Sequence, residues 1–110
     1  MKELFINNIK TLIGSNAKEN WKLLEDSKPN NLFFHLSSFP SCYVILQTES
    51  DILPDLETIK ETALVCKNNT KCKTIPNLKV DYTYCKNVIK GEYVGEIIYK
   101  SNKKVNQIKI

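Results

Sequence analysis

The single histidine of the chain, His35, is the first residue whose chemistry invites a question. It lies at the edge of a short polar segment between two apolar runs, and Ser41 and Cys42 follow within seven positions. A turn could bring the hydroxyl or the thiol to the imidazole as a nucleophile and its base. The GxSxG turn that presents many serine nucleophiles is absent from the sequence. We expect no enzymatic activity, and a small hydrolase or nuclease using His35 with Ser41 or Cys42 is the alternative.

The four cysteines are the next candidates, as ligands of a metal ion. Cys42, Cys66, Cys72 and Cys85 are separated by 24, 6 and 13 positions, which gives no CxxC pair. A zinc site would need all four thiolates, or three of them with His35, at an unusual spacing. We therefore expect reduced, partly buried thiols and neither a metal nor another cofactor.

A phosphate group could be held by Gly14-Ser15-Asn16, which precede the predicted start of a helix. Free N–H groups at a helix N-terminus attract anions. The segment contains one glycine and lacks the GxxxxGK[ST] pattern of phosphate-binding loops. Helix capping alone is enough to explain it.

Positive charge is unevenly distributed along the chain. Residues 1–59 contain five lysines against eight acidic residues, whereas residues 60–110 contain eleven lysines against four, so the two parts carry −3 and +7. An anionic partner would be attracted to the second part. The sequence has no arginine, so bidentate guanidinium contacts cannot contribute to such binding.

Three of these lysines are predicted to share one side of a helix that begins near Pro54. The buried face of this helix is predicted to consist of Leu56, Ile59, Ala63 and Cys66. Lys67 and Lys71 follow Lys60 by 7 and 11 positions, which places each within ~20° of it around a helix. The spacing predicts a basic stripe, although a merely solvated face is the common alternative for three lysines.

The elements before this helix follow from the hydrophobic pattern. Residues 4–6 and 9–13 predict a β-hairpin, with Asn7-Asn8 suited to the positive φ angles of a tight turn. Asn16 and Glu19 form a capping-box pattern that predicts the start of a helix. The apolar face of that helix is predicted to comprise Ala17, Trp21 and Leu24.

Three segments predict strands in the middle of the chain. Residues 32–36 and 43–47 are short runs of apolar, aromatic and β-branched residues. In residues 78–84, apolar and polar side chains alternate, which predicts a strand with one buried face. The buried face would consist of Leu78, Val80, Tyr82 and Tyr84.

A final hairpin is predicted from residues 93–100 and 105–110, turning at Ser101-Asn102. Strands at both ends with helices between them predict a single α+β domain over residues 1–110. Its sheet is expected to be largely antiparallel and to carry two principal helices.

Nothing in the sequence predicts contact with a membrane. No segment approaches the ~18 apolar residues that a membrane-spanning helix needs. The first ten residues, MKELFINNIK, lack the apolar core of a secretory signal. We therefore expect a cytoplasmic protein.

Several ordered motifs together resemble one known family. Residues 13–23 contain Gly14, Asn16, Glu19-Asn20 and Leu23, residues 29–35 read PNNLFFH, and residues 40–46 read PSCYVIL. Shorter motifs follow in residues 80–83, 87–88 and 93–95. In this order, over nearly all 110 residues, they resemble the NFACT RNA-binding domain (NFACT-R), and the short length is similar to its stand-alone branch.

The sequence also departs from the NFACT-R pattern. Phe33 stands where the family usually has tryptophan, and Asn30-Asn31 replace two aspartates. Ser41-Cys42-Tyr43 replace Gly-Ser-His, so the second histidine of the family is missing. If the paired histidines contact nucleic acid, Tyr43 must substitute by stacking or through its hydroxyl group. If they brace two strands, an aromatic partner for His35 suffices.

The resemblance implies nucleic-acid binding without catalysis, most directly of RNA such as tRNA or rRNA. It also implies a link to the ribosome, translation and ribosome-associated quality control, although the other domains of the larger family members are not expected here. DNA binding is one alternative, because the stand-alone branch is associated with it. A protein-interaction adaptor that docks on a ribosomal or nucleoprotein assembly is the other.

The expected site lies between the polar segment and the second helix. The phosphate backbone is expected to be attracted by Lys60, Lys67, Lys71, Lys73, Lys79, Lys86 and Lys90. Local recognition is expected from His35, Tyr43, Asn68 and Asn87. A purely structural role for His35 is the interpretation we favour, because buried imidazoles are commonly held by hydrogen bonds.

Overall fold

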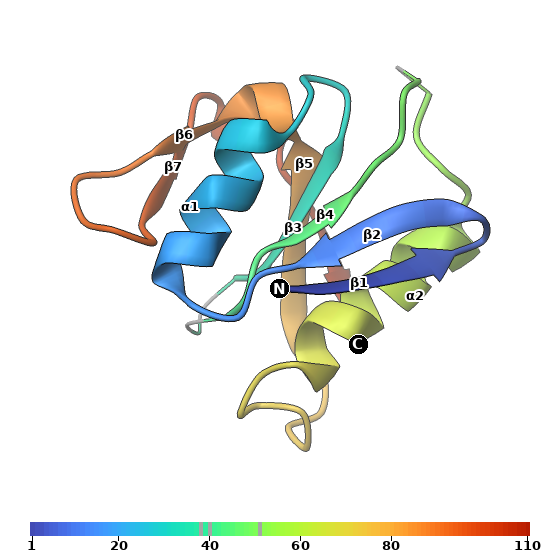
Figure 1. The fold of residues 1–110 in the computed structure, drawn as a ribbon. Coiled ribbons are helices and arrows are strands. Elements are labelled where there is room, and N and C mark those ends of the chain that lie inside the picture. The colour runs from blue at the N-terminus through green and yellow to red at the C-terminus, as the bar shows by residue number, and fades with distance from the viewer. Residues whose placement is uncertain (38, 40, 51) are drawn as a thin grey trace.

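The computed structural model describes residues 1–37, 39, 41–50 and 52–110 (Figure 1). Ser38 and Pro40 of the polar segment therefore lie outside the described residues. The strands are β1 (Lys2–Ile6), β2 (Ile9–Ile13), β3 (Leu32–Leu36), β4 (Val44–Leu46), β5 (Lys79–Tyr84), β6 (Val88–Lys90), β7 (Ile97–Tyr99) and β8 (Asn106–Lys109). The helices are α1 (Ala17–Asp26) and α2 (Leu56–Asn68), with short 3₁₀ turns η1 (Cys85–Asn87) and η2 (Asn102–Lys104).

Within these described ranges, the strands form two antiparallel sheets. The larger sheet has six strands in the order β1-β2-β4-β3-β5-β8, and β6 pairs with β7 in a separate ladder. The predicted α+β class, with a largely antiparallel sheet and two principal helices, is confirmed. Neither helix of the described chain is long and apolar enough to cross a lipid bilayer.

The first two strands form the predicted hairpin. Ile6 pairs with Ile9 directly beside the turn. Asn7 and Asn8 have φ angles of 49° and 67°, in the left-handed region that asparagine tolerates better than most residues. Local turn chemistry therefore determines the register of this hairpin.

Helix α1 begins with the predicted capping interactions. The Asn16 side chain accepts a hydrogen bond from Glu19 N at 2.9 Å, and the Glu19 carboxylate accepts one from Ser15 N at 2.9 Å. The predicted apolar face is only partly correct, because Ala17 is exposed and Trp21 is half-buried. The first turn of α1 borders a cavity, so the helix buries side chains further along: Asn20, Leu23 and Leu24.

Helix α2 begins after Asp55, whose side chain accepts a hydrogen bond from Thr58 N. Three residues of the predicted face, Ile59, Ala63 and Cys66, are buried against the sheet. The prediction is wrong for Leu56, which is 59% exposed, because the first turn of the helix buries Thr58 instead.

The central strands β3 and β4 are buried on both faces. On one face, their side chains pack beneath α2, and these are Leu32, Phe34, Leu36, Val44 and Leu46. On the other face, Phe33 and Ile45 pack with Leu23 and Leu24 of α1 and with Val88 of β6. Figure 1 shows α2 on one side of the sheet and α1 with the β6–β7 ladder on the other.

Strand β5 also differs from the predicted pattern of one buried face. Asp81 and Thr83 are buried together with Val80, whereas Tyr82 and Tyr84 are half-buried. The Asp81 carboxylate accepts hydrogen bonds from Tyr99 Oη at 3.2 Å and from Gln107 Nε2 at 2.9 Å. Polar side chains therefore occupy the second face because β7 and β8 supply partners for them.

The predicted final hairpin is wrong. Strand β7 pairs with β6, and β8 crosses to the edge of the main sheet and pairs with β5. The Asn87 side chain accepts a hydrogen bond from Ser101 N at 2.9 Å and donates one to Ser101 O at 3.0 Å. These bonds hold the end of β7 beside the start of β6, so the chain must cross over before β8.

Gly14 lies between β2 and α1, where a side chain would not fit. A Cβ atom there would be 2.0 Å from Asn20 Oδ1 and 3.2 Å from Asn20 Cα. The same Oδ1 atom accepts a hydrogen bond from Tyr43 N at 3.2 Å. We predict that Gly14→Ala lowers the free energy of unfolding by about 1–3 kcal/mol, measured by chemical denaturation.

Gly91→Ala is the matched control. A Cβ atom on Gly91 would meet only the side chain of exposed Glu96, which can rotate away. Its cost should be below about 1 kcal/mol. Equal losses in the two variants would contradict the proposed close approach of Gly14 and Asn20.

Candidate functional site

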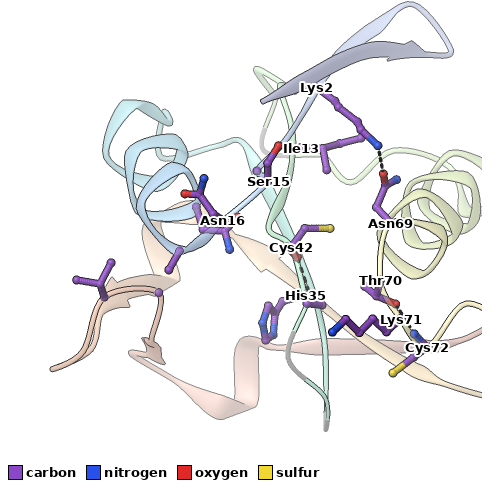
Figure 2. Close-up of a pocket in the computed structure, with 16 residues that line it drawn as sticks. Lys2, Ile13, Ser15, Asn16, His35, Cys42, Asn69, Thr70, Lys71 and Cys72 are labelled. Carbon is purple, nitrogen blue, oxygen red and sulfur yellow. Dashed lines mark hydrogen bonds between the residues drawn. The ribbon is translucent and has the colours of Figure 1, made fainter.

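A cavity of about 870 Å³ opens where α1 begins and α2 ends, and we call it the His35 cavity (Figure 2). Its wall combines the turn into α1, the ends of β3 and β4, the residues after α2, and the loop between β6 and β7. The polar side chains in the wall are Lys2, Ser15, Asn16, Asn20, His35, Ser41, Asn69, Thr70 and Lys71. The structure thus brings His35 and Lys71 into one site, as the sequence predicted for the polar segment and the second helix.

Two contacts hold distant segments together around this cavity. Gly14 N donates a hydrogen bond to Tyr43 O at 3.1 Å, which joins the end of β2 to the start of β4. Lys2 Nζ donates a hydrogen bond to Asn69 Oδ1 at 2.8 Å, which joins β1 to the C-terminal end of α2 (Figure 2). The cavity is therefore a product of the sheet topology and not of any one motif.

The wall of the His35 cavity is positively charged. It contains Lys2 and Lys71, and among the residues that the structure describes, none in this wall is acidic. Lys71 is exposed and forms no ion pair within the described part of the chain. The nearby Glu19 carboxylate is neutralised by the amino group of Met1 at 2.7 Å. This arrangement attracts anions.

His35 contributes a ring, but not a positive charge, to the cavity. Its imidazole stacks on Phe33, with centroids 6.1 Å apart, and meets the edge of the Tyr43 ring at 5.5 Å. Burial lowers the pKa of His35 below its usual 6.5, although the Asp81 carboxylate opposes this shift. The imidazole is therefore neutral near pH 7, and its packing supports the bracing role that we favoured from the sequence.

Tyr43 was predicted to contact nucleic acid, but the structure places it in the core. The residue is fully buried, and its hydroxyl group donates a hydrogen bond to Gly95 O. Burial raises the pKa of Tyr43 to about 12. Its ring offers no exposed face for base stacking, because it packs against Phe33 and His35.

The two predicted asparagines have different surroundings. Asn87 is buried, and its amide group is fully engaged with Thr83 and Ser101, so it is not available to a ligand. Asn68, the last residue of α2, is exposed but does not line the cavity. The adjacent Asn69 does line it.

The predicted basic stripe on α2 does not form. Lys67 is only 9% exposed, and its Nζ donates a hydrogen bond to Ile110 O at 3.1 Å. Lys71 lies beyond the end of the helix at Asn68, so helical spacing no longer relates it to Lys60. Lys60 itself is exposed on α2 but does not line the cavity.

Two predicted lysines lie close to the polar segment and the turn after α2. Lys73 is exposed and follows Lys71 by two positions. Lys79 is exposed at the start of β5, and its carbonyl oxygen accepts a hydrogen bond from Ser37 N at 2.9 Å. Neither of these two lysines lines the His35 cavity itself.

The last two predicted lysines lie elsewhere. Lys86 lies 5.3 Å from the centre of the Tyr84 ring and lines a second cavity, of about 570 Å³, near the other end of β5. Strand β5 spans roughly 17 Å from Lys79 to Tyr84, and Lys86 follows that far end. Lys90 forms an ion pair with Glu25 and lies 5.0 Å above the Trp21 ring. The predicted lysines thus occupy several surfaces and not one.

Ser41 and Cys42 do not form a nucleophile–base pair with His35 within the described residues. Ser41 Oγ accepts a hydrogen bond from Leu36 N and donates one to Cys42 O, each at 3.0 Å. The four cysteines are not joined by disulfides. In the described part of the chain, no three His, Cys, Asp or Glu side chains come together as metal ligands.

Sequence reasoning missed Lys2, Asn69 and Thr70 as parts of the site. Lys2 belongs to the part of the sequence that carries net negative charge, and Asn69 and Thr70 match no binding motif. Only the position of β1 beside the end of α2 brings them together. No local signal could have revealed this.

Comparisons with known proteins bear on the fold. No protein-family model matches the chain, and no curated protein matches it. A solved structure described as the C-terminal of the fibronectin/fibrinogen-binding protein from Streptococcus suis is similar to it, with a TM-score of 0.83 and 20% sequence identity. The match covers 98% of this chain and 43% of that one, so the chain spans less than half of that structure. At this identity, the likeness shows a shared fold.

The lowered pKa of His35 predicts a specific pH dependence of stability. The unfolded chain takes up a proton at His35 near pH 6.5, whereas the folded chain does so only at lower pH. The contribution of His35 to stability is therefore complete above pH 6.5 and declines below it. We predict that the wild type loses up to about 1.4 kcal/mol more than His35→Phe between pH 7.5 and 5.5.

Chemical denaturation at the two pH values measures both losses. Phenylalanine keeps a ring against Phe33 but cannot take up a proton, so it is the matched variant. Equal losses in the two proteins would show that His35 has the same protonation behaviour in the folded and unfolded chain.

Proposed function

We propose that this chain is a non-enzymatic RNA-binding domain that binds its ligand over the His35 cavity. The observation that carries the proposal is a cavity whose described wall residues include Lys2 and Lys71 and no acidic residue. The resemblance of the sequence to the NFACT-R family supports RNA, such as tRNA or rRNA, over other polyanions. The similarity to the streptococcal structure supports the fold and not this choice of ligand.

The surroundings of the cavity suit a nucleic-acid strand. Lys71, Lys73 and Lys79 are exposed and would attract phosphate groups, while Asn16 and Asn69 offer amide groups for hydrogen bonds. Tyr93 is 69% exposed next to Val94, which lines the cavity, so its ring could stack on a base.

We also propose a cellular location and a process for this domain. We place it in the cytoplasm, in translation or ribosome-associated quality control, since the NFACT-R resemblance implies this process. DNA is the alternative ligand, because the stand-alone branch of the NFACT-R family is associated with DNA binding. Both nucleic acids therefore belong in the binding experiment.

The salt dependence of binding tests the contribution of lysine. We predict that affinity for single-stranded RNA, measured by fluorescence anisotropy, falls with salt at a log–log slope of roughly −3 if about four lysines contact phosphates. Lys71→Glu should weaken binding at least about tenfold at low salt and reduce the magnitude of the slope by at least ~0.7. Measurements with tRNA and duplex DNA identify the preferred ligand.

Lys22→Glu is the control for net charge. Lys22 is exposed on α1, where it pairs with Asp26, and it does not line the cavity. Its substitution makes the same change in net charge but should weaken binding much less. If RNA affinity did not change with salt, or if the two substitutions weakened binding equally, the His35 cavity would not be the binding site.

A protein-interaction adaptor is the second candidate function. Ile52, Leu53 and Leu56, just before and at the start of α2, are 79%, 41% and 59% exposed. Neighbouring apolar side chains on a surface often mark a docking site. The streptococcal protein with the similar fold is itself named as a fibronectin/fibrinogen-binding protein, which is a name for protein binding. The proposed partner is a ribosomal or nucleoprotein assembly.

Binding to purified ribosomes before and after nuclease treatment separates the two candidates. If the domain is an adaptor, the wild type should still bind ribosomal proteins after nuclease treatment, and the Leu56→Ser variant should not bind them. An RNA-binding domain should lose the ribosome after nuclease treatment or in Lys71→Glu, and Leu56→Ser should have little effect.

A further inference from the structure

Cys42 and Cys66 bring two thiols together where the start of β4 meets α2. Cys42 Sγ lies 3.8 Å from Cys66 O, and Cys66 Sγ lies 3.8 Å from Cys42 O. Each sulfur therefore lies against the main chain of the other residue. The two side chains are therefore neighbours, as those of any two cysteines that form a disulfide bond must be.

The two thiols differ in their access to solvent. Cys42 is half-buried and lines the His35 cavity, so a small solute can reach it. Cys66 has no exposed surface and packs in the core on the buried face of α2. An oxidant would therefore meet Cys42 first, and Cys66 would be positioned behind it.

The electrostatic surroundings also favour Cys42 as the thiol that reacts first. A hydrogen bond from the Cys66 thiol and the positive charge of Lys2 both lower the pKa of Cys42. The contact with Cys42 and burial raise the pKa of Cys66. Because a thiolate is the reactive form of cysteine, the cavity-facing sulfur is the more nucleophilic of the pair.

We propose that Cys42 and Cys66 form a peroxide-sensitive thiol pair that closes to a disulfide bond. The Cys42 thiol releases its proton, the thiolate attacks the terminal oxygen of a hydroperoxide, and the O–O bond breaks. Cys42 becomes a sulfenic acid, and the alkoxide or hydroxide that leaves takes up the released proton to give an alcohol or water. The sulfur of Cys66 then attacks the sulfenic sulfur, the S–O bond breaks, and water leaves with the Cys66 proton. Two thiols are oxidised and one hydroperoxide is reduced.

This reaction would link the wall of the His35 cavity covalently to α2. The sulfur of Cys42 would become bonded to a residue of the core and would no longer be available in the cavity. The new bond would also close a loop of 24 positions between the two cysteines. Such a loop restricts the unfolded chain, so oxidation should raise the melting temperature by about 5 °C or more.

Peroxide treatment of the full chain tests the proposal directly. The protein is incubated with a small excess of hydrogen peroxide, remaining thiols are alkylated, and the peptides are mapped by mass spectrometry without reduction. We expect an intrachain Cys42–Cys66 link in the folded protein. A link from Cys42 to Cys72, which also lines the cavity, or no intrachain link at all, would overturn the proposal.

Two variants separate the roles of the sulfurs. In Cys66→Ala, the Cys42 sulfenic acid has no resolving partner, so labelling of Cys42 by dimedone should increase several-fold. Cys85→Ala is the matched control, because Cys85 is buried on the opposite face of the sheet and should leave the link intact. Dimedone labelling of Cys72 instead of Cys42, in the variant or in the wild type, would contradict the proposed order.

Discussion

Burial of β3 and β4 on both faces is the constraint on which the rest of the structure depends. The side chains of Leu32, Phe33, Phe34, Tyr43 and Val44 have no exposed surface. A single helix cannot cover both faces of a sheet, so α2 packs on one face and α1 with the β6–β7 ladder packs on the other. The His35 cavity opens between the edges of these two covers, where the first turn of α1, the end of α2 and the β6–β7 loop meet.

Local sequence patterns identified the elements that depend on their own residues. The Asn7-Asn8 turn, the Asn16 cap and the central strands were predictable because each has its signal within a few positions. The partners of β7 and β8 were not predictable. They depend on Asn87, whose side chain forms hydrogen bonds with the main chain of Ser101, fourteen positions later. A buried polar residue whose partners lie far along the chain has the same local pattern as an exposed one. This is also why Asp81 was taken for a residue on an exposed face.

The candidate site was predictable to the extent that it involves neighbours in sequence. The proximity of His35 to Ser41 and Cys42 follows from two adjacent antiparallel strands, and Lys71 joins them because α2 packs across the same strands. Lys67 and Tyr43 were misjudged for one physical reason. A long side chain with a polar end can be buried when the main chain of a distant residue accepts its hydrogen bond, as Ile110 and Gly95 do here. Composition cannot reveal such an acceptor.

The residues that carry the resemblance to NFACT-R mostly serve the architecture. Gly14 gives room to Asn20, Asn20 accepts a hydrogen bond from Tyr43 N, and Asn31 binds the main chain of Lys28 and Thr48. These contacts would persist whatever ligand the domain binds. Because one architecture can carry several functions, a motif of this kind specifies the cavity and not its occupant. The ligand must be selected by groups that the motif does not require, such as the exposed ammonium groups around the cavity. Substituting those groups, and not the motif, therefore separates the proposed function from the fold that supports it.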